Sequence, residues 1–371
     1  MTSSSIPANP YPDRPPIRAG IIGYGLAGAV FHAPLIAATP GMRVNAIVTS
    51  HPERRARASS AFPSAAIYAS PDVLFSDPHQ LDLVVVATPN RAHAALGIAA
   101  LQAGLPVVID KPFASSSAEA ERVVQVARES GKLLTVFQNR RWDNDFLTLQ
   151  RLIASDSLGP VVRVESRFER FRPDIKPDAW RERPDPEEGG GLLFDLGAHL
   201  IDQARVLFGQ PVSVYAESDI RRAGAEVDDD TFVALRFAGG QVAHLWMSVI
   251  PRQSGPRFRV VGTRGVYEKH GLDPQEDALS RGMRPGHLGW GIEPRERWGH
   301  LSTSAGGLAV DGVVETLTGS YETYYALVRD ALIAGGPPPV DPADSLAVLR
   351  IIEAARESAR SGRVIALTSE S

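Results

Sequence analysis

The sequence predicts an α/β protein that contains two sheets of different kinds. Three observations lead to this expectation: the length of 371 residues, strand–helix alternation in the first part of the chain, and long alternating segments after it. One hydrophobic core rarely grows beyond roughly 250–300 residues, so the length favours two domains. We expect a doubly wound parallel sheet first and a large, mainly antiparallel sheet after it.

Short apolar runs separated by helical stretches indicate the parallel sheet. Strands are expected at 17–22, 42–48, 83–87, 106–109 and 133–137, with helices at 92–103 and 117–130. The run at 83–87 is apolar without interruption, as expected of a strand that is covered on both faces. This spacing of strands and helices is typical of successive parallel strand–helix–strand units.

Beyond residue 138, apolar and polar residues alternate with a period of two. Such segments, at 161–169, 212–220, 231–237, 241–249 and 257–262, favour a sheet with one covered face. Residues 270–305 are rich in Gly, Pro, Arg and Trp, and we expect them to form a long ordered loop. Two helices are expected at 321–334 and 342–361, the second capped by Asp341 and ended by Gly362.

These patterns predict three parts of the chain. Residues 1–15 are Ser- and Pro-rich and are expected to form a disordered tail. Residues 16–138 form a first predicted domain around the parallel sheet, and residues 139–371 form a second around the antiparallel sheet.

Composition excludes several classes of function. Lys plus Arg number 39 and Asp plus Glu 43, and this balance argues against nucleic acid as the main partner. The absence of cysteine excludes disulfides, iron–sulfur clusters and thiolate zinc sites. No apolar run approaches the roughly 20 residues that a membrane span needs. The N-terminal tail lacks the apolar region of a signal peptide, so we expect a soluble, cytoplasmic protein without a membrane partner.

A glycine-rich turn follows the first strand and opens a helix. It has the pattern G-x-G-x-x-G, made of Gly23, Tyr24, Gly25, Leu26, Ala27 and Gly28. In this context the three glycines serve a tight turn, close approach of a pyrophosphate, and close helix–strand packing. The pattern predicts dinucleotide binding, with a purely structural turn as the alternative. Pro34 is expected to kink or restart the helix that follows.

The end of the second strand favours a phosphorylated dinucleotide. NAD-binding folds usually place an acidic residue there to bind the ribose hydroxyls. This chain has Thr49 and Ser50 instead, followed by Arg54 and Arg55. A small hydroxyl beside guanidinium groups suits a 2'-phosphate, so NADP(H) is the preferred cofactor and NAD(H) the second choice. The alternative is that both arginines are solvated helix residues.

Two further strand ends carry polar residues. In an open α/β sheet, ligands bind at the carboxyl ends of the strands. The first of these ends offers Thr88, Pro89, Asn90 and His93 to the cofactor, although His93 could equally be a water-exposed residue at a helix start. The second has Asp110 and Lys111 ahead of Pro112, and both are expected to contribute to the cofactor site. We also expect Lys111 to act in the active site, with an exposed surface lysine as the alternative.

Asp195 and His199 form a third candidate group, after the run Gly189-Gly190-Gly191. The two residues are four apart, so they share one face of a helix. The pair could act in catalysis, or it could be a buried hydrogen bond that holds the helix. A metal pair is a further alternative, but no additional ligands with zinc-like spacing accompany it, so no metal site is expected.

Together these segments resemble the Gfo/Idh/MocA family of oxidoreductases. The resemblance is carried by GYGLAGAVFHAPLI from residue 23, VVVATPNRAH from 84, DKPFA from 110, VFQNRRWDNDF from 136, GGGLLFDLGAHLIDQ from 189 and VVGTRGVYEKHGLDPQE from 260. The first and fourth segments look most like the NADP-dependent scyllo-inositol dehydrogenase branch. The resemblance implies a Rossmann domain followed by an α/β domain with an open, mainly antiparallel sheet.

The resemblance also implies a catalytic set made of Lys111, Asp195 and His199. Asp110 stands where the family usually has Glu, and the lysine and proline after it are retained. With a reference pKa near 6.5, a histidine such as His199 suits a general base. Lys111 would stabilise the developing alkoxide, and Asp195 would orient these groups or bind a neighbouring hydroxyl.

Four residues beyond the last parallel strand are candidates for substrate binding, with packing at the domain boundary as the alternative: Asn139, Arg141, Trp142 and Asp145. The predicted function is NADP(H)-dependent hydride transfer on a secondary alcohol or ketone of a cyclic polyol or sugar. Two alternatives remain: an NAD-dependent glycosidase of the same fold, and a non-catalytic dinucleotide sensor. The resemblance further implies a homodimer or homotetramer that assembles through the open sheet.

Overall fold

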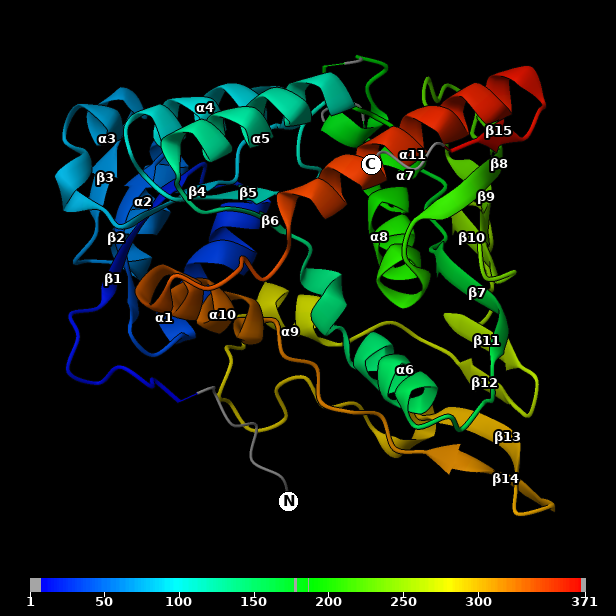
Figure 1. Ribbon diagram of the computed structural model, residues 1–371. Coiled ribbons are helices and arrows are strands. Elements are labelled where there is room, and N and C mark those ends of the chain that lie inside the picture. The colour runs from blue at the N-terminus through cyan, green and yellow to red at the C-terminus, as the bar shows by residue number, and fades with distance from the viewer. Residues whose placement is uncertain (1–7, 177–178, 186, 368–371) are drawn as a thin grey trace. The chain divides into compact units, whose positions relative to one another are not determined.

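The computed structural model describes residues 8–176, 179–185 and 187–367 and divides the chain into two compact units (Figure 1). The first unit holds the chain up to residue 142 together with 274–291 and 318–346, and the second holds the remainder. The sequence predicts a single boundary after residue 138, whereas the two units interleave along the chain. The reason is that Trp290, Tyr321, Tyr324 and Tyr325 belong to the hydrophobic core of the first unit.

The first unit contains the expected parallel sheet of six strands. Its order is β3 (Ala66–Tyr68), β2 (Met42–Val48), β1 (Ile17–Ile22), β4 (Leu83–Val86), β5 (Val107–Asp110) and β6 (Leu134–Phe137). Each neighbouring pair runs parallel. The chain order reverses between β1 and β4, and such a switch point is where an open sheet of this kind binds its ligand.

Among the described residues, five α-helices of the first unit lie between its strands in sequence, and α9 and α10 come from later parts of the chain. They are α1 (Ala33–Ala38), α2 (Pro52–Ala61), α3 (Asp72–Ser76), α4 (His93–Gln102), α5 (Ser117–Ser130), α9 (Gln275–Ser280) and α10 (Glu322–Ala334). α5 has the predicted bounds, because Ser116 accepts a hydrogen bond from the backbone N–H of Glu119 and Gly131 adopts the left-handed conformation at its end. The predicted effect of Pro34 is confirmed: a π-helical turn at Ala27–His32 ends, and α1 begins with Pro34 in its first turn.

The core of the first unit joins the sheet to α10. Tyr324 and Tyr325 are fully buried beside Phe137, with ring centroids 5.0 and 6.0 Å from it. Trp290 is also fully buried, and its indole N–H donates to Glu322 over 2.8 Å. Residues distant in the sequence therefore complete the core against which the parallel sheet packs.

The second unit contains a sheet of nine strands. Its order is β14 (Leu308–Val314), β13 (Gly299–Ala305), β12 (Val266–Lys269), β11 (Phe258–Gly262), β7 (Val161–Glu169), β10 (Val242–Ser248), β9 (Asp230–Phe237), β8 (Pro211–Asp219) and β15 (Ile365–Ala366). Within this sheet, only β7 and β10 pair in parallel among the described strands, so the prediction of a mainly antiparallel sheet is confirmed.

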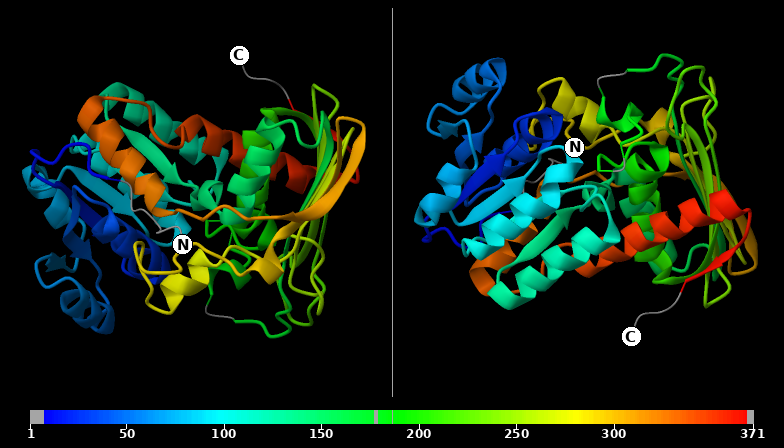
Figure 2. Two further views of the ribbon diagram at one scale, coloured as in Figure 1. Left: turned by 90° about the horizontal axis from the view of Figure 1, so that it is seen from below. Right: turned by 90° about the horizontal axis from the view of Figure 1, so that it is seen from above.

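One face of this sheet is packed by helices, as Figure 2 shows for α8. The helices of this unit are α6 (Asn144–Ala154), α7 (Leu192–Asp195), α8 (Gly197–Phe208) and the larger part of α11 (Pro342–Ser361). Alternate residues of β9 and β10 are buried, which is the pattern of a sheet with one covered face. α11 begins as predicted, because Asp341 accepts a hydrogen bond from the N–H of Ala343.

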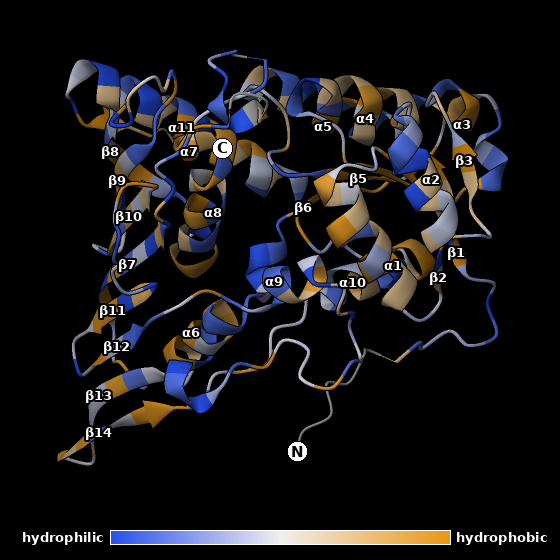
Figure 3. Cartoon of the chain, turned by 180° about the vertical axis from the view of Figure 1, so that it is seen from behind, coloured by the Kyte–Doolittle hydropathy of each residue, from blue (hydrophilic) through white to orange (hydrophobic). Residues whose placement is uncertain are grey.

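The prediction of a long loop at 270–305 is wrong in part. Within it lie α9, the short 3-10 turn Arg295–Arg297 and the strand β13, which forms a hairpin with β14. Figure 3 colours much of β14 as hydrophobic, and Leu308, Val310 and Val313 are exposed. β13 escaped prediction because its residues His300 to Ser304 are mostly polar, so the alternation of apolar residues is weak.

The predicted tail at 1–15 lies partly outside the described residues. From Asn9 onward the chain forms turns, in which Asn9 accepts a hydrogen bond from the N–H of Tyr11 over 3.0 Å. None of the helices within the described residues is long and apolar enough to span a membrane.

Candidate active site

The glycine turn of the first unit has the shape that a dinucleotide requires. Gly23 has a positive φ of 101°, and a Cβ there would lie 2.3 Å from the carbonyl oxygen of Ala87. A Cβ on Gly28 would lie 2.0 Å from the oxygen of Gly23, so the helix packs directly on the turn. Gly25 differs, because the nearest atom to a Cβ there is Nη1 of Arg54 at 3.6 Å. The middle glycine therefore leaves its backbone approachable, and these residues fit a bound pyrophosphate.

Arginines on α2 lie beside this turn. Arg54 approaches Gly25, and Arg57 donates to the carbonyl oxygen of Tyr24 over 3.3 Å with its guanidinium 5.4 Å from the Tyr24 ring centroid. Both side chains, and that of Arg55, belong to exposed residues. Arg57 is missing from the predicted set, although its spacing of three from Arg54 places both on one side of the helix.

The other predicted members of the turn and of the β2 end differ in exposure. Tyr24 is buried, Leu26 is 62% exposed and Ala27 is half-buried. At the end of β2, Thr49 is buried and Ser50 is exposed. Ser50 is therefore the residue of this pair that a ligand could reach directly.

At the end of β4, His93 binds two backbone segments together. Its Nδ1 lies 2.8 Å from the carbonyl oxygen of Pro112 and its Nε2 lies 2.9 Å from that of Thr88. The ring is buried, and burial lowers the pKa of His93 despite the opposing effects of Asp110 and the two carbonyls. His93 is therefore not the water-exposed residue of the alternative interpretation, and it joins the backbone after β4 to the backbone after β5.

Three other residues at this strand end have different surroundings. The Thr88 hydroxyl is buried and finds no hydrogen-bond partner among the described residues. A hydroxyl of this kind beside the glycine turn suits a ligand that supplies the missing partner. Pro89 is exposed, and Asn90 is buried at the start of a 3-10 turn.

Asp110 is held by a buried chain of polar groups. The Asp110 carboxylate lies 3.6 Å from Nε2 of His32, and Nδ1 of His32 lies 2.6 Å from the hydroxyl of Tyr325. The same carboxylate accepts the backbone N–H of Lys111 over 2.8 Å. Burial alone would raise the pKa of Asp110, but His32, His93 and Lys111 outweigh it and hold that pKa below its usual value.

This arrangement explains how the chain accommodates Asp in place of Glu before Lys111. The Asp110 carboxylate pairs with the imidazole of His32, which belongs to the π-helical turn. The same imidazole contacts the hydroxyl of Tyr325 on α10. Lys111 itself is half-buried at the carboxyl end of β5, directly after Asp110. An ammonium group at such a strand end can stabilise negative charge on a substrate oxygen.

The four predicted substrate residues are engaged in packing. Arg141 forms an ion pair with Asp344 at 3.1 Å, and Asn139 is buried. Trp142 packs edge-to-face on Tyr324 at 5.6 Å. Asp145, which lies in the second unit, is fully buried 3.3 Å from Nε of Arg257. These contacts describe the surroundings of the four residues, and their role in substrate binding stays a prediction.

Asp195 and His199 stand on either side of a break in the expected helix. α7 ends at Asp195 and α8 begins at Gly197. His199 is 3% exposed and its ring stands edge-to-face with Phe168 at 6.3 Å. The Asp195 carboxylate lies 3.7 Å from Nε of Arg181. Because an imidazole at this depth is shielded from bulk water, it suits proton transfer to a bound substrate.

α7 is positioned by a carboxylate from another segment. Asp228 accepts the N–H of Leu193 over 2.7 Å, which caps the start of the helix. Gly191 makes this possible, because a Cβ there would lie 1.8 Å from the Asp228 carboxylate. Burial raises the pKa of Asp228, outweighing its hydrogen bonds from Leu193 and Thr231. Asp228 was not predicted, although it stands in a run of three aspartates at 228–230.

Comparison with known families identifies both parts of the chain. A model described as "Oxidoreductase family, NAD-binding Rossmann fold" matches residues 17–138. A second, described as "Oxidoreductase family, C-terminal alpha/beta domain", matches residues 150–367. The chain belongs to the Gfo/Idh/MocA family of oxidoreductases. This confirms the resemblance inferred from the sequence and the expectation of an enzyme.

Individual relatives of this Gfo/Idh/MocA chain are similar over nearly their full length. An uncharacterized oxidoreductase of Escherichia coli, YdgJ, is 42% identical over 93% of this chain and 96% of its own. The scyllo-inositol 2-dehydrogenase (NADP(+)) IolW of Bacillus subtilis is 37% identical over 95% and 96%. The crystal structure of an oxidoreductase from Bacillus cereus has a TM-score of 0.86 at 27% identity, covering 96% and 99%.

Proposed function

We propose that this Gfo/Idh/MocA oxidoreductase transfers hydride between NADP(H) and a secondary alcohol or ketone of a cyclic polyol or sugar. The observation that carries the cofactor part is the end of β2, where Ser50 is exposed and Arg54 approaches Gly25 of the glycine turn. The relative IolW, whose name states NADP(+) and scyllo-inositol, supports the same direction.

The preference for NADP(H) follows from charge. No carboxylate stands at the end of β2 to bind the 2'-hydroxyl of NAD, since Thr49 and Ser50 occupy that place. Arg54, Arg55 and Arg57 instead present guanidinium groups on the helix that follows. A guanidinium group can donate two parallel hydrogen bonds to two oxygens of one phosphate group, whereas a neutral ribose hydroxyl offers it no such charged partner.

The proposed chemistry assigns one role to each polar residue. The nicotinamide, when bound, accepts or supplies the hydride. His199 removes the hydroxyl proton of the alcohol, because a neutral imidazole is the side chain best suited to this transfer near neutral pH. Lys111 stabilises negative charge on the same oxygen, and Asp195 binds a neighbouring hydroxyl or orients the other two groups.

An inositol-like ring is the proposed substrate class. Two relatives carry the word inositol in their names: IolW, and the inositol 2-dehydrogenase 2 of Saccharopolyspora erythraea, which is 30% identical over 60% of this chain. A ring with several hydroxyls would use both the Asp195 carboxylate and the Lys111 ammonium as hydrogen-bond partners.

A substrate panel tests this function. Inositols, aldoses and aryl glycosides are incubated with NADP or NAD, and the absorbance of the reduced nicotinamide is followed. We expect turnover of at least one cyclic polyol, with a higher kcat/KM when NADP is the cofactor. Release of the aryl group without net reduction would instead identify a glycosidase, and binding of dinucleotide without any turnover would identify a sensor.

A further inference from the structure

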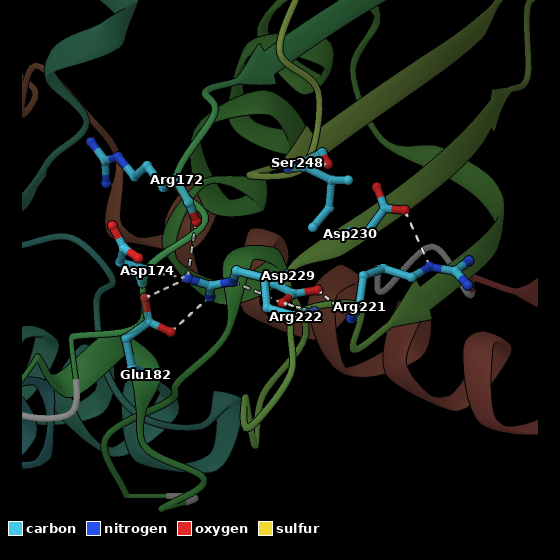
Figure 4. A network of polar contacts seen from close by, with 9 residues as sticks. Arg172, Asp174, Glu182, Arg221, Arg222, Asp229, Asp230 and Ser248 are labelled. Carbon is cyan, nitrogen blue, oxygen red and sulfur yellow. Dashed lines mark hydrogen bonds and ion pairs between the residues drawn. The ribbon is translucent and has the colours of Figure 1, made fainter.

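Arg222 makes a dense set of polar contacts in the second unit. Its Nη2 donates to Glu182 over 2.8 Å, and its Nε donates to Asp229 over 2.9 Å. Its Nη1 lies 3.3 Å from the carbonyl oxygens of Arg172 and Asp174 (Figure 4). The arginine side chain is 7% exposed and that of Asp229 is fully buried. One guanidinium thus holds two carboxylates and two backbone carbonyls.

These contacts join two segments that are far apart in the sequence. Arg222 and Asp229 lie in the connection between β8 and β9, whereas Arg172, Asp174 and Glu182 belong to the stretch between β7 and α7. Asp229 is fixed further by the backbone N–H groups of Arg221 and Arg222, at 2.7 and 3.0 Å. The connection between β8 and β9 is therefore held by several hydrogen bonds, and Arg222 attaches the stretch between β7 and α7 to it.

The attached stretch leads directly to Asp195. Glu182 ends the short 3-10 turn Trp180–Glu182, and its neighbour Arg181 places Nε 3.7 Å from the Asp195 carboxylate. The carbonyl oxygen of Arg181 also accepts the N–H of Gly191 over 3.0 Å. A Cβ on Gly190 would lie 2.0 Å from the carbonyl oxygen of Arg183, so this turn is packed against the glycines that precede α7.

We propose that Arg222 is a positioning residue for Asp195, which it orients through Glu182 and Arg181. This inference rests on the proposed function, because Asp195 is assigned a role there. A lysine could not replace Arg222, because an ammonium group lacks the planar guanidinium that contacts both the Glu182 and the Asp229 carboxylates. Removing the guanidinium leaves the Asp229 and Glu182 carboxylates without this partner in a largely buried place, and the turn loses its attachment.

Arg222→Gln tests the proposal, with Arg221→Gln as the matched control. Arg221 is the adjacent arginine, and its side chain is 54% exposed. This side chain contacts Asp219 and, as Figure 4 shows, Asp230, but not Glu182. We expect Arg222→Gln to lower kcat by roughly 10–100-fold, the order of loss that follows a small misplacement of a reacting group. NADP affinity should stay within about twofold, because the contacts lie in the other unit. Equal effects of the two variants, or a normal kcat in Arg222→Gln, would overturn the inference.

A double-mutant cycle separates positioning from general stability. If Arg222 acts through Arg181, then Arg181→Gln combined with Arg222→Gln should lose much less kcat than the product of the two single losses. Multiplicative losses would show that Arg222 affects only the stability of the unit. Glu182→Gln keeps the Arg222–Asp229 pair, so it provides a second variant should Arg222→Gln fold poorly. It should lower kcat in the same direction.

Hydrogen exchange distinguishes failure of this inference from failure of the proposed function. If the unmodified protein turns over no member of the substrate panel, the proposed function is wrong. The amides of Leu192 to Asp195 are then compared between Arg222→Gln and Arg221→Gln. Faster exchange in Arg222→Gln alone would support the attachment of α7 to Arg222, and equal exchange would contradict it.

Discussion

Each of the two units has single residues that are candidates for a chemical role. In the first unit, Arg54 approaches Gly25, whose backbone is left open and could receive a phosphate group. In the second unit, His199 is buried beside Phe168 and follows α7, the helix that Asp228 caps. Each residue has its effect because of what surrounds it, and this makes three predictions testable by single substitutions.

Arg54→Gln is expected to weaken NADP binding while leaving NAD binding nearly unchanged. A lost charge-assisted contact costs about 1.5–3 kcal/mol, which corresponds to roughly a 10–150-fold rise in Kd. Titration of both dinucleotides by fluorescence measures the ratio. Arg55→Gln tests the neighbouring candidate, and Arg43→Gln, an exposed arginine within β2, serves as the control. An unchanged NADP/NAD ratio in both Arg54 and Arg55 variants would remove the assignment.

His199→Ala is expected to lower kcat by roughly 10²–10⁴-fold with little change in NADP affinity, because the loss concerns proton transfer. Lys111→Ala should also impair turnover, and the double variant should lose less than the product of the two effects if both act on one oxygen. His270→Ala, which removes an exposed histidine of the second unit, is the control. Near-normal turnover in the His199 variant would exclude it as the general base.

Asp110→Asn is expected to lower the free energy of unfolding at pH 7. The folded-state pKa of Asp110 is below its ordinary value of 3.8, so the ionised group stabilises the fold above that pH. This contribution is lost as the pH falls below 3.8 through the lower folded-state pKa. Denaturant titrations between pH 7 and pH 2 should therefore show the two proteins converging at low pH. A constant difference would contradict the role of the His32 pair, and Asp13→Asn, at an exposed residue, is the control.

At the scale of elements, α7 depends on a partner from outside its own sequence. The helix spans only Leu192–Asp195, too short to be stable by propensity. Asp228 caps its start, and Arg181 contacts the segment that leads into it. The break before Gly197 separates Asp195 from the helix that carries His199, so the two side chains are positioned by different contacts.

Gly191→Ala is expected to destabilise the protein more than Gly209→Ala. Both glycines have positive φ, at 96° and 78°, but a Cβ meets Asp228 only at position 191 and open space at position 209. Both also have an extended ψ, at 161° and −149°, a region that essentially only glycine adopts, and the strain common to both costs about 1–3 kcal/mol. Displacing the cap adds about 0.5–2 kcal/mol at position 191. Thermal unfolding of the two variants measures the difference, and equal Tm values would show that the Asp228 contact contributes nothing.

At the scale of the whole molecule, the chain returns to its first unit after leaving it. α10 supplies Tyr324 and Tyr325 to the core that packs against the parallel sheet, and the segment after α9 supplies Trp290. A buried aromatic side chain contributes about 3–5 kcal/mol, while an entire domain is stable by only about 5–15 kcal/mol. Without these later segments, the first 138 residues would therefore lose a large part of the free energy of unfolding of their unit.

A fragment of residues 16–138 is accordingly expected to show no cooperative thermal transition. Joining residues 16–142 to 318–346 through a flexible linker should restore one, because α10 then returns to its place against Phe137 and His32. Circular dichroism during heating measures both proteins. A fragment 16–138 that melts at the Tm of the intact protein would contradict the importance of the returning helix.

Local patterns in the sequence were sufficient to predict the two sheets, the bounds of α5 and α11, and the restart of the helix at Pro34. These features depend on periodicity, caps and a fixed proline φ, all of which act within a few residues. The glycine turn was predictable for the same reason, and the match to an NAD-binding Rossmann fold over residues 17–138 agrees with it. The preference for NADP(H) over NAD(H) is our proposal.

Only the tertiary structure decided which side chains support these local features. The Tyr325–His32–Asp110 chain, the capping of α7 by Asp228 and the bridge made by Arg222 join residues up to 293 positions apart. No local pattern marks such partners, because a buried polar group is satisfied by whatever the fold brings within hydrogen-bond distance. The sequence by itself determined most of the strands and the candidate chemistry, whereas long-range packing determined which groups support that chemistry.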